Sequence, residues 1–153
     1  MPATYSISGV GPAANTTANT AGIVKCEQGA TLSQARIYEI EWGAQANSND
    51  FMYTIRAKRQ TSTGTWTAQT PAPLDTSHYQ ASFCAGGINS TIAGAASTVL
   101  CAGWGFHQRA GFRWNSVPNG ELAVAVAANN GIIVEYLFAQ STDSGIGTIW
   151  VWE

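Results

Sequence analysis

Apolar and polar residues alternate with a period of two along most of this chain, which is the pattern of β-strands that bury one face. Segment 38–42 (YEIEW) places tyrosine, isoleucine and tryptophan on one face and two glutamates on the other, and segment 51–56 (FMYTIR) repeats the pattern. In segment 122–126, branched residues alternate with alanines. Segment 132–138 is almost continuously apolar, as in a strand that is covered on both faces. No segment has a convincing helical period, so the pattern predicts an all-β protein.

Turn signals separate the apolar runs at regular intervals. Asn119-Gly120 and Asn130-Gly131 are strong hairpin signals between apolar runs. Gly, Asn, Asp and Ser also cluster between other runs, at 47–50, 62–64 and 143–145. Shorter strands are predicted at 5–9, 22–26, 65–68, 79–84, 98–104, 110–114 and 148–152. About ten short strands at this spacing predict an antiparallel β-sandwich or jelly roll.

The length of 153 residues suits one domain of ordinary size. Residues 9–20 (GVGPAANTTANT) lack apolar periodicity and are predicted to be a linker, which makes 5–8 a separable N-terminal strand. We therefore expect an N-terminal strand and linker over residues 1–20 and a single β-sandwich domain over 21–153. Residues 86–97, which are rich in Gly, Ala and Ser, are predicted to form a long loop.

Charged residues are scarce, at 10% of the chain where about a quarter is usual. A formal net charge of -2 offers no long-range attraction to phosphate backbones or anionic lipids. Nucleic acid and membrane surfaces are therefore poor candidate partners. Residues 1–10 lack the basic and apolar regions of a secretion signal, and no apolar stretch approaches the length of a membrane span. These features predict synthesis in the cytoplasm.

The cysteines and histidines form no pattern that predicts a metal site. Cys26, Cys84 and Cys101 have no CxxC spacing and are expected to be buried or half-buried thiols, with a bridge between Cys84 and Cys101 as the alternative. His78 and His107 lie 29 positions apart and neither belongs to a zinc-type cluster. No cofactor is expected.

No motif for nucleophilic, nucleotide or dinucleotide chemistry occurs in the chain. Glu39 and Glu41 would share one strand face at about 7 Å, within the range of a glycosidase carboxylate pair. Such enzymes normally take their two carboxylates from different elements. We therefore interpret this pair as part of a solvated face or an interface rim, and we expect no catalytic residue.

Six tryptophans are a high share for a chain of this size. In segment 149–152 (IWVW) the alternation places Trp150 and Trp152 on one face. They are either core residues or a contact with a protein partner or a sugar, because tryptophan combines a large apolar area with one N–H donor.

Two of the seven basic residues lie close together in segment 108–114 (QRAGFRW). On a strand, Arg109 and Arg113 would share one face, with the alanine, phenylalanine and tryptophan of the segment on the other. Two arginines on one face predict a local ion pair or a carboxylate-binding edge. A solvated face is the alternative.

Four segments of this chain resemble small decoration, or cement, proteins on the capsids of tailed bacteriophages. They are 4–9 (TYSISG) with the Ala/Asn/Thr linker that follows, 36–43 (RIYEIEWG), 108–114 (QRAGFRW) and 118–122 (PNGEL). The resemblance implies a β-sandwich or jelly-roll body that binds outside the capsid shell and bridges neighbouring major capsid proteins. It also implies assembly as a trimer or dimer, with no catalysis and no cofactor.

The composition agrees with this resemblance, because charged residues are depleted in the cores of interfaces. We expect a virion protein on the capsid exterior whose partners are the major capsid protein and further copies of itself. The candidate interface residues are Tyr5, Ile7, Arg109, Arg113, Trp150 and Trp152. The N-terminal strand contributes the first two, since it could add to an open sheet edge of a neighbour. The alternative function is a carbohydrate-binding β-sandwich module on a virion or tail surface.

Overall fold

The computed structural model of this chain describes residues 3–10, 20–28, 34–44, 52–62, 64–77, 82–92, 96–107, 109–127, 129–137 and 145–153. Within these ranges the regular structure is entirely β. The strands are β1 (Thr4–Val10), β2 (Thr20–Gln28), β3 (Arg36–Ala44), β4 (Met52–Gln60), β5 (Thr65–Gln69), β6 (Ala72–Pro73), β7 (Cys84–Ile92), β8 (Ala96–His107), β9 (Phe112–Asn115), β10 (Leu122–Ala123), β11 (Gly131–Leu137) and β12 (Gly145–Trp152). None of the described residues forms a helix that could cross a membrane.

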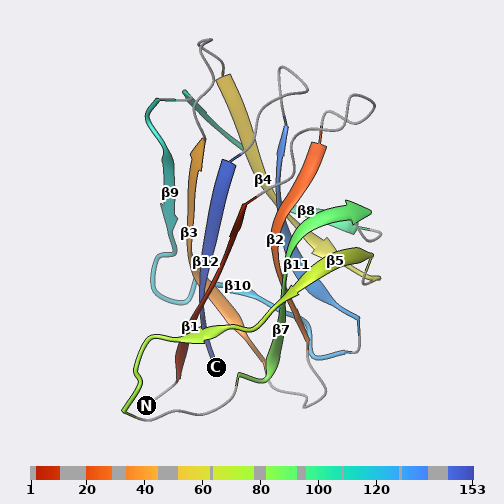
Figure 1. The fold of residues 1–153 in the computed structure, drawn as a ribbon, viewed down its shortest axis with the longest axis vertical. Helices are drawn as coiled ribbons and strands as arrows, with labels where there is room; N and C mark the ends of the chain where they lie inside the picture. Colours follow the sequence, from red (N-terminus) through yellow and green to blue (C-terminus); the bar gives the residue numbers. More distant parts are fainter. Residues whose placement is uncertain are drawn as a thin grey trace.

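The strands form two antiparallel six-stranded sheets that pack as a β-sandwich, which confirms the predicted fold class. Sheet A has the order β10-β3-β12-β1-β6, with β9 also paired to β3, and sheet B has the order β5-β7-β2-β11-β4-β8. Strands from the two ends of the chain pair with each other, β1 with β12 in sheet A and β2 with β11 in sheet B. The first and last described residues, Ala3 and Glu153, therefore lie side by side at one end of the molecule (Figure 1).

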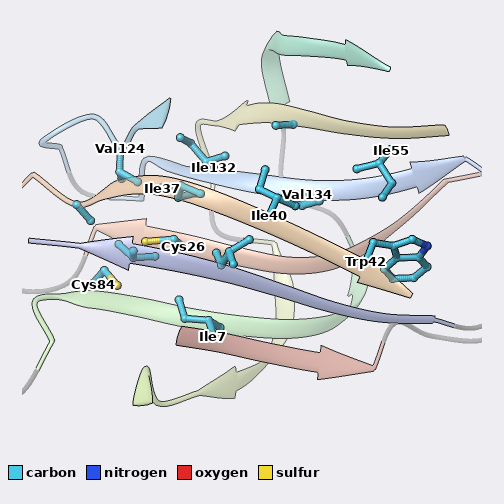
Figure 2. Packing of buried hydrophobic residues seen from close by; sticks show 14 of the residues in the cluster. Ile7, Cys26, Ile37, Ile40, Trp42, Ile55, Cys84, Val124, Ile132 and Val134 are labelled. Carbon is cyan, nitrogen blue, oxygen red and sulfur yellow. The ribbon is translucent and has the colours of Figure 1, made fainter. Parts of the chain in front are cut away.

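The core lies between the sheets and follows from the alternation of apolar residues. On sheet A it is formed by inward-facing residues of β1, β3 and β12, among them Ile40, Trp42 and Ile149. On sheet B it is formed by residues of β2, β4 and β11, among them Ile55 and Val134 (Figure 2). The period-two pattern thus has a simple physical cause, since every second side chain of these strands is removed from water.

Aromatic side chains join the two sheets along one edge of the sandwich. Trp104, on β8 of sheet B, packs against Phe112 and Trp114 on β9 of sheet A, with ring centroids 5.2 and 5.7 Å apart. Phe106 of β8 also contacts Phe112, at 6.0 Å. Trp42 therefore belongs to the core, and Trp104 and Trp114 pack against it.

The N-terminal strand is an inner strand of sheet A. β1 pairs with β12 over seven residue pairs, from Thr4 opposite Trp152 to Val10 opposite Ile146, and with β6 on its other side. The side chains of Tyr5 and Ile7 are 1% and 0% exposed. In this structure β1 therefore belongs to the sandwich of its own chain. Residues 11–19, most of the predicted linker, lie outside the described residues.

The prediction of a long loop over residues 86–97 is wrong, because most of this segment is in strands. β7 runs to Ile92 and β8 begins at Ala96. Of the predicted strand 79–84, residues 79–81 lie outside the described residues, and among the other three only Cys84 is in a strand. The small residues are needed for close packing. A Cβ at Gly86 would lie 2.4 Å from the backbone oxygen of Gln69 on β5. Similarly, the predicted strand 122–126 is ordered as a strand only over β10.

β11 is covered on both faces, as its continuous apolar sequence predicted. Ile132 and Val134 face the core, and Ile133 on the opposite face is also fully buried. This chain itself provides the cover on both faces. The buried second face of β11 is therefore not by itself a reason to expect a partner.

The cover on the second face of β11 comes from the curvature of sheet B. β4 and β5 are four strand positions apart in sheet B, which would separate them by about 19 Å if the sheet were flat. The chain from Gln60, at the end of β4, to Thr65, at the start of β5, spans at most about 17 Å when fully extended. β7 and β8 are also four strand positions apart, but the chain from Ile92 to Ala96 that joins them spans at most about 14 Å. Sheet B must therefore curl, and it bends over the face that points away from sheet A. β5 and the second half of β7 lie together on one side of the molecule (Figure 1).

Candidate functional site

The candidate site is the outer face of sheet A, which points away from sheet B. On β12, Ile149 and Val151 enter the core, so Trp150 and Trp152 lie on the outer face, where both are half-buried. The interpretation of these two tryptophans as core residues is therefore wrong. The two indole rings point outward because the IWVW sequence alternates along the strand, with branched residues on one face and tryptophans on the other.

Cross-strand pairing sets the neighbours of each tryptophan on this face. Trp150 lies between Ser6 of β1 and Glu39 of β3. Trp152 lies between Thr4 and Arg36 on the same two strands. The guanidinium carbon of Arg36 sits 5.4 Å from the centre of the Trp152 ring, which is a cation–π contact. The result is a row of two indole rings flanked by hydroxyl and charged side chains.

A second row of polar residues crosses the outer face beside Trp150. Thr148 is paired with Ser8 of β1 and Glu41 of β3, and its hydroxyl donates to the Ser8 hydroxyl at 2.9 Å. Arg113 of β9 pairs with Glu41 and completes this row. The outer face therefore displays side chains from four neighbouring strands.

Arg113 forms ion pairs with both glutamates of β3. Its Nε lies 2.6 Å from Oε1 of Glu39 and 3.4 Å from Oε1 of Glu41. This confirms the predicted local ion pair at Arg113. The arginine side chain is 60% exposed, so the pairs contribute little to stability. Their effect is to place an arginine and two carboxylates, held together, at the margin of the tryptophan row.

A hollow of about 460 Å³ adjoins this margin. Glu41, Arg113 and Thr148 contribute to its polar wall, and Phe112 and the exposed Ile146 contribute to its apolar wall. The hollow widens the outer face toward the turn that precedes β9. The face therefore combines an open strand surface with a depression at one end.

The structure brings three of the six predicted interface residues together, namely Arg113, Trp150 and Trp152. Arg109 lies in the turn before β9, because the strand begins at Phe112 and not at residue 110. The prediction that the two arginines share a strand face is therefore wrong. Tyr5 and Ile7 are inside the protomer.

Sequence reasoning missed Arg36 as a member of this face. Nothing in its local pattern connects it with Trp152, since the contact depends on the register between β3 and β12. Arg36 also approaches Glu121, with 3.8 Å between Nη1 and Oε2. Both arginines of the outer face are thus positioned by a carboxylate.

The cysteines lie in the core rather than in a site. Cys26 and Cys84 are buried free thiols on neighbouring strands β2 and β7, so the alternative of a Cys84–Cys101 bridge is wrong (Figure 2). A hydrogen bond between the two thiols and burial raise the pKa of Cys26 well above its ordinary value. The side chain of Cys101 lies outside the described residues.

No group of three or more potential metal ligands is present in the described part of the chain. His107 accepts a hydrogen bond from the backbone N–H of Arg109 at its Nδ1, 3.3 Å away. His78 lies outside the described residues.

Comparison with models of protein families, with curated proteins and with solved structures found no match for this chain.

Proposed function

We propose that this protein is a structural virion protein that decorates the exterior of a tailed-phage capsid and docks on the major capsid protein through the outer face of sheet A. The proposal includes no catalysis and no cofactor. Its support is the resemblance in four sequence segments together with the chemistry of this face.

The observation that carries the proposal is the gathering of Trp150, Trp152, Arg36 and Arg113 on one sheet face. Tryptophan and arginine are the residue types that most often dominate the binding energy of protein interfaces. The arginines are already held by glutamates and, for Arg36, by an indole ring, so docking does not need to order them from a free state.

A cement protein acts through many weak contacts. Each copy needs only a moderate buried area, because repetition over a closed shell multiplies the effect through avidity. The scarcity of charge in this chain agrees with extensive burial against a lattice or against further copies. We propose a homotrimer, or a dimer, that bridges neighbouring capsid subunits.

The test is whether the purified protein rebinds capsids that have been stripped of it. Substituting Trp150→Ala and Trp152→Ala together should weaken rebinding by at least about thirtyfold, which is the cost of losing one interface hot spot of about 2 kcal/mol. Rebinding is measured by co-sedimentation over a range of protein concentrations.

Trp66→Ala is the matched control, since it removes a half-buried tryptophan from β5 of sheet B. It should leave rebinding unchanged. Wild-type protein that fails to rebind, or equal losses from the two sheets, would contradict docking through sheet A.

A further inference from the structure

The curled face of sheet B encloses a second polar site that the proposed docking function does not use. This face carries Glu27, Gln60, Ile133 and Glu135, of which the last three are at most 2% exposed. Glu27 and Gln60 lie on either side of Gly131 in the strand pairing. Because glycine has no side chain, their side chains can meet across β11.

A hydrogen bond fixes the carboxylate of Glu27. The Nε2 atom of Gln60 donates to Oε2 of Glu27 at 3.0 Å, and both side chains are buried. The Oε1 atom of Gln60 has no hydrogen-bond partner among the described residues. This oxygen is a buried acceptor, so a ligand that donates a hydrogen bond would complement this region.

A hollow of about 330 Å³ opens beside Glu27, a volume at the lower end of the range for small-molecule sites. One wall is the side chain of Trp66 on β5, and Thr65 provides a hydroxyl. The remaining lining includes Ala68 and Ala85, whose small side chains leave the space open. A flat indole, a carboxylate and a hydroxyl thus surround a space without bulky residues.

The charges described on this face disfavour an anionic ligand. Glu135 is held by ion pairs with Arg56 and Lys58, the latter at 2.5 Å. Both of these cations pair with Glu135, and the carboxylate beside the hollow, that of Glu27, repels an anion. The hollow beside Glu27 therefore offers an aromatic wall and a carboxylate acceptor, which suit a hydroxylated ligand.

We propose that this hollow is a binding site for a neutral saccharide. One face of the sugar ring, which is made of C–H groups, stacks on the Trp66 indole, and a sugar hydroxyl donates to the carboxylate of Glu27. The site lies on the sheet opposite the docking face, so a capsid-bound copy keeps it on the other side of its sandwich. The inference does not depend on the proposed docking function.

The experiment is a titration with neutral sugars, namely glucose, galactose, mannose and N-acetylglucosamine with their disaccharides, followed by the indole N–H signals in NMR spectra. We expect at least one sugar to shift the Trp66 signal, which is assigned from a Trp66→Phe variant, and to leave the Trp150 signal in place. Glu27→Gln should weaken binding by at least about tenfold, because a charge-assisted hydrogen bond is lost.

Ala85→Leu fills the hollow without changing a polar group and should abolish binding while the thermal midpoint stays close to that of the wild type. Trp150→Ala is the matched control and should bind sugar normally. The proposal is overturned if no sugar shifts the Trp66 signal, if Ala85→Leu binds as well as the wild type, or if methylammonium binds in preference to every sugar. Capsid rebinding by the double variant Trp150→Ala, Trp152→Ala tests the docking proposal separately.

Discussion

At the scale of single residues, the paired thiols of Cys26 and Cys84 make stability sensitive to alkaline pH. The native pKa of Cys26 is raised by its hydrogen bond to Cys84 and by burial. Above the ordinary thiol pKa the unfolded chain loses its proton while the native state keeps it, so the free energy of unfolding falls as pH rises. The loss approaches about 1.4 kcal/mol per pH unit until the native pKa is reached.

Urea unfolding between about pH 8 and pH 10.5 measures this loss. A Cys26→Ala variant should be less stable overall but should show a flatter dependence on pH. Tyr38, whose pKa is also raised by burial and by Glu39, contributes in the same direction near the top of this range. An identical slope in wild type and variant would contradict the assignment to Cys26.

A second residue-scale prediction concerns Glu153, whose carboxylate holds the start of β7. It accepts hydrogen bonds from the backbone N–H groups of Phe83 and Cys84, both at 2.8 Å, and from the Ser82 hydroxyl at 2.9 Å. Glu153→Ala should lower the free energy of unfolding by about 1–3 kcal/mol, since partly buried donors lose their acceptor. Glu121→Ala, which breaks only the pair with Arg36, should cost less than about 1 kcal/mol in the same urea experiment.

At the scale of elements, Gly86 of β7 decides how closely β7 approaches β5. Gly86→Ala would place a Cβ 2.4 Å from a backbone oxygen of β5, which cannot move without disturbing the β5–β7 pairing. We expect a loss of about 1–3 kcal/mol in the free energy of unfolding, as for other overpacked sites. Gly43→Ala meets nothing within 4 Å and should change stability by less than about 0.5 kcal/mol. Equal effects of the two substitutions would show that residue 86 is not tightly packed.

The same glycine explains an error of prediction at this scale. Residues 86–97 have the composition of a flexible loop, yet β7 and the start of β8 occupy most of the segment. A segment rich in small residues can be a flexible loop, but it can also be a strand that packs too closely for larger side chains. Gly86 is the second case, because it packs against β5 and against Ile7 of β1. A local pattern does not distinguish the two causes.

At the scale of the whole molecule, the two sheets have different surfaces. Sheet A is open on its outer face and displays tryptophan and arginine, and sheet B curls over its outer face and buries charged residues there. In the proposed functions, one sheet contacts the capsid and the other holds a sugar.

The low charge of the chain leads us to predict a homo-oligomer at micromolar concentration. Sedimentation velocity over a range of concentrations should show a trimer, or failing that a dimer. A strict monomer, both free and in its assembly, would contradict this prediction. Because β11 is covered by its own chain, the prediction rests on composition and on the sequence resemblance.

The sequence by itself determined that the chain is all-β and, for most of β12 and β11, which side of the strand is buried, because period-two alternation is a local property of neighbouring residues. The outward position of Trp150 and Trp152 relative to Ile149 follows from four consecutive letters. The sequence predicted that Arg113 forms an ion pair, but it did not identify Glu39 and Glu41 as the partners.

Only the tertiary structure decided which strands became neighbours. The contact of Arg36 with Trp152, the pairing of Cys26 with Cys84 and the meeting of Glu27 with Gln60 over Gly131 all join residues far apart in the chain. These contacts depend on register and on the curl of sheet B. Both are set by burial and hydrogen bonding across the whole sandwich. A shift of one residue in the pairing of a strand would move its buried side chains to the outer face.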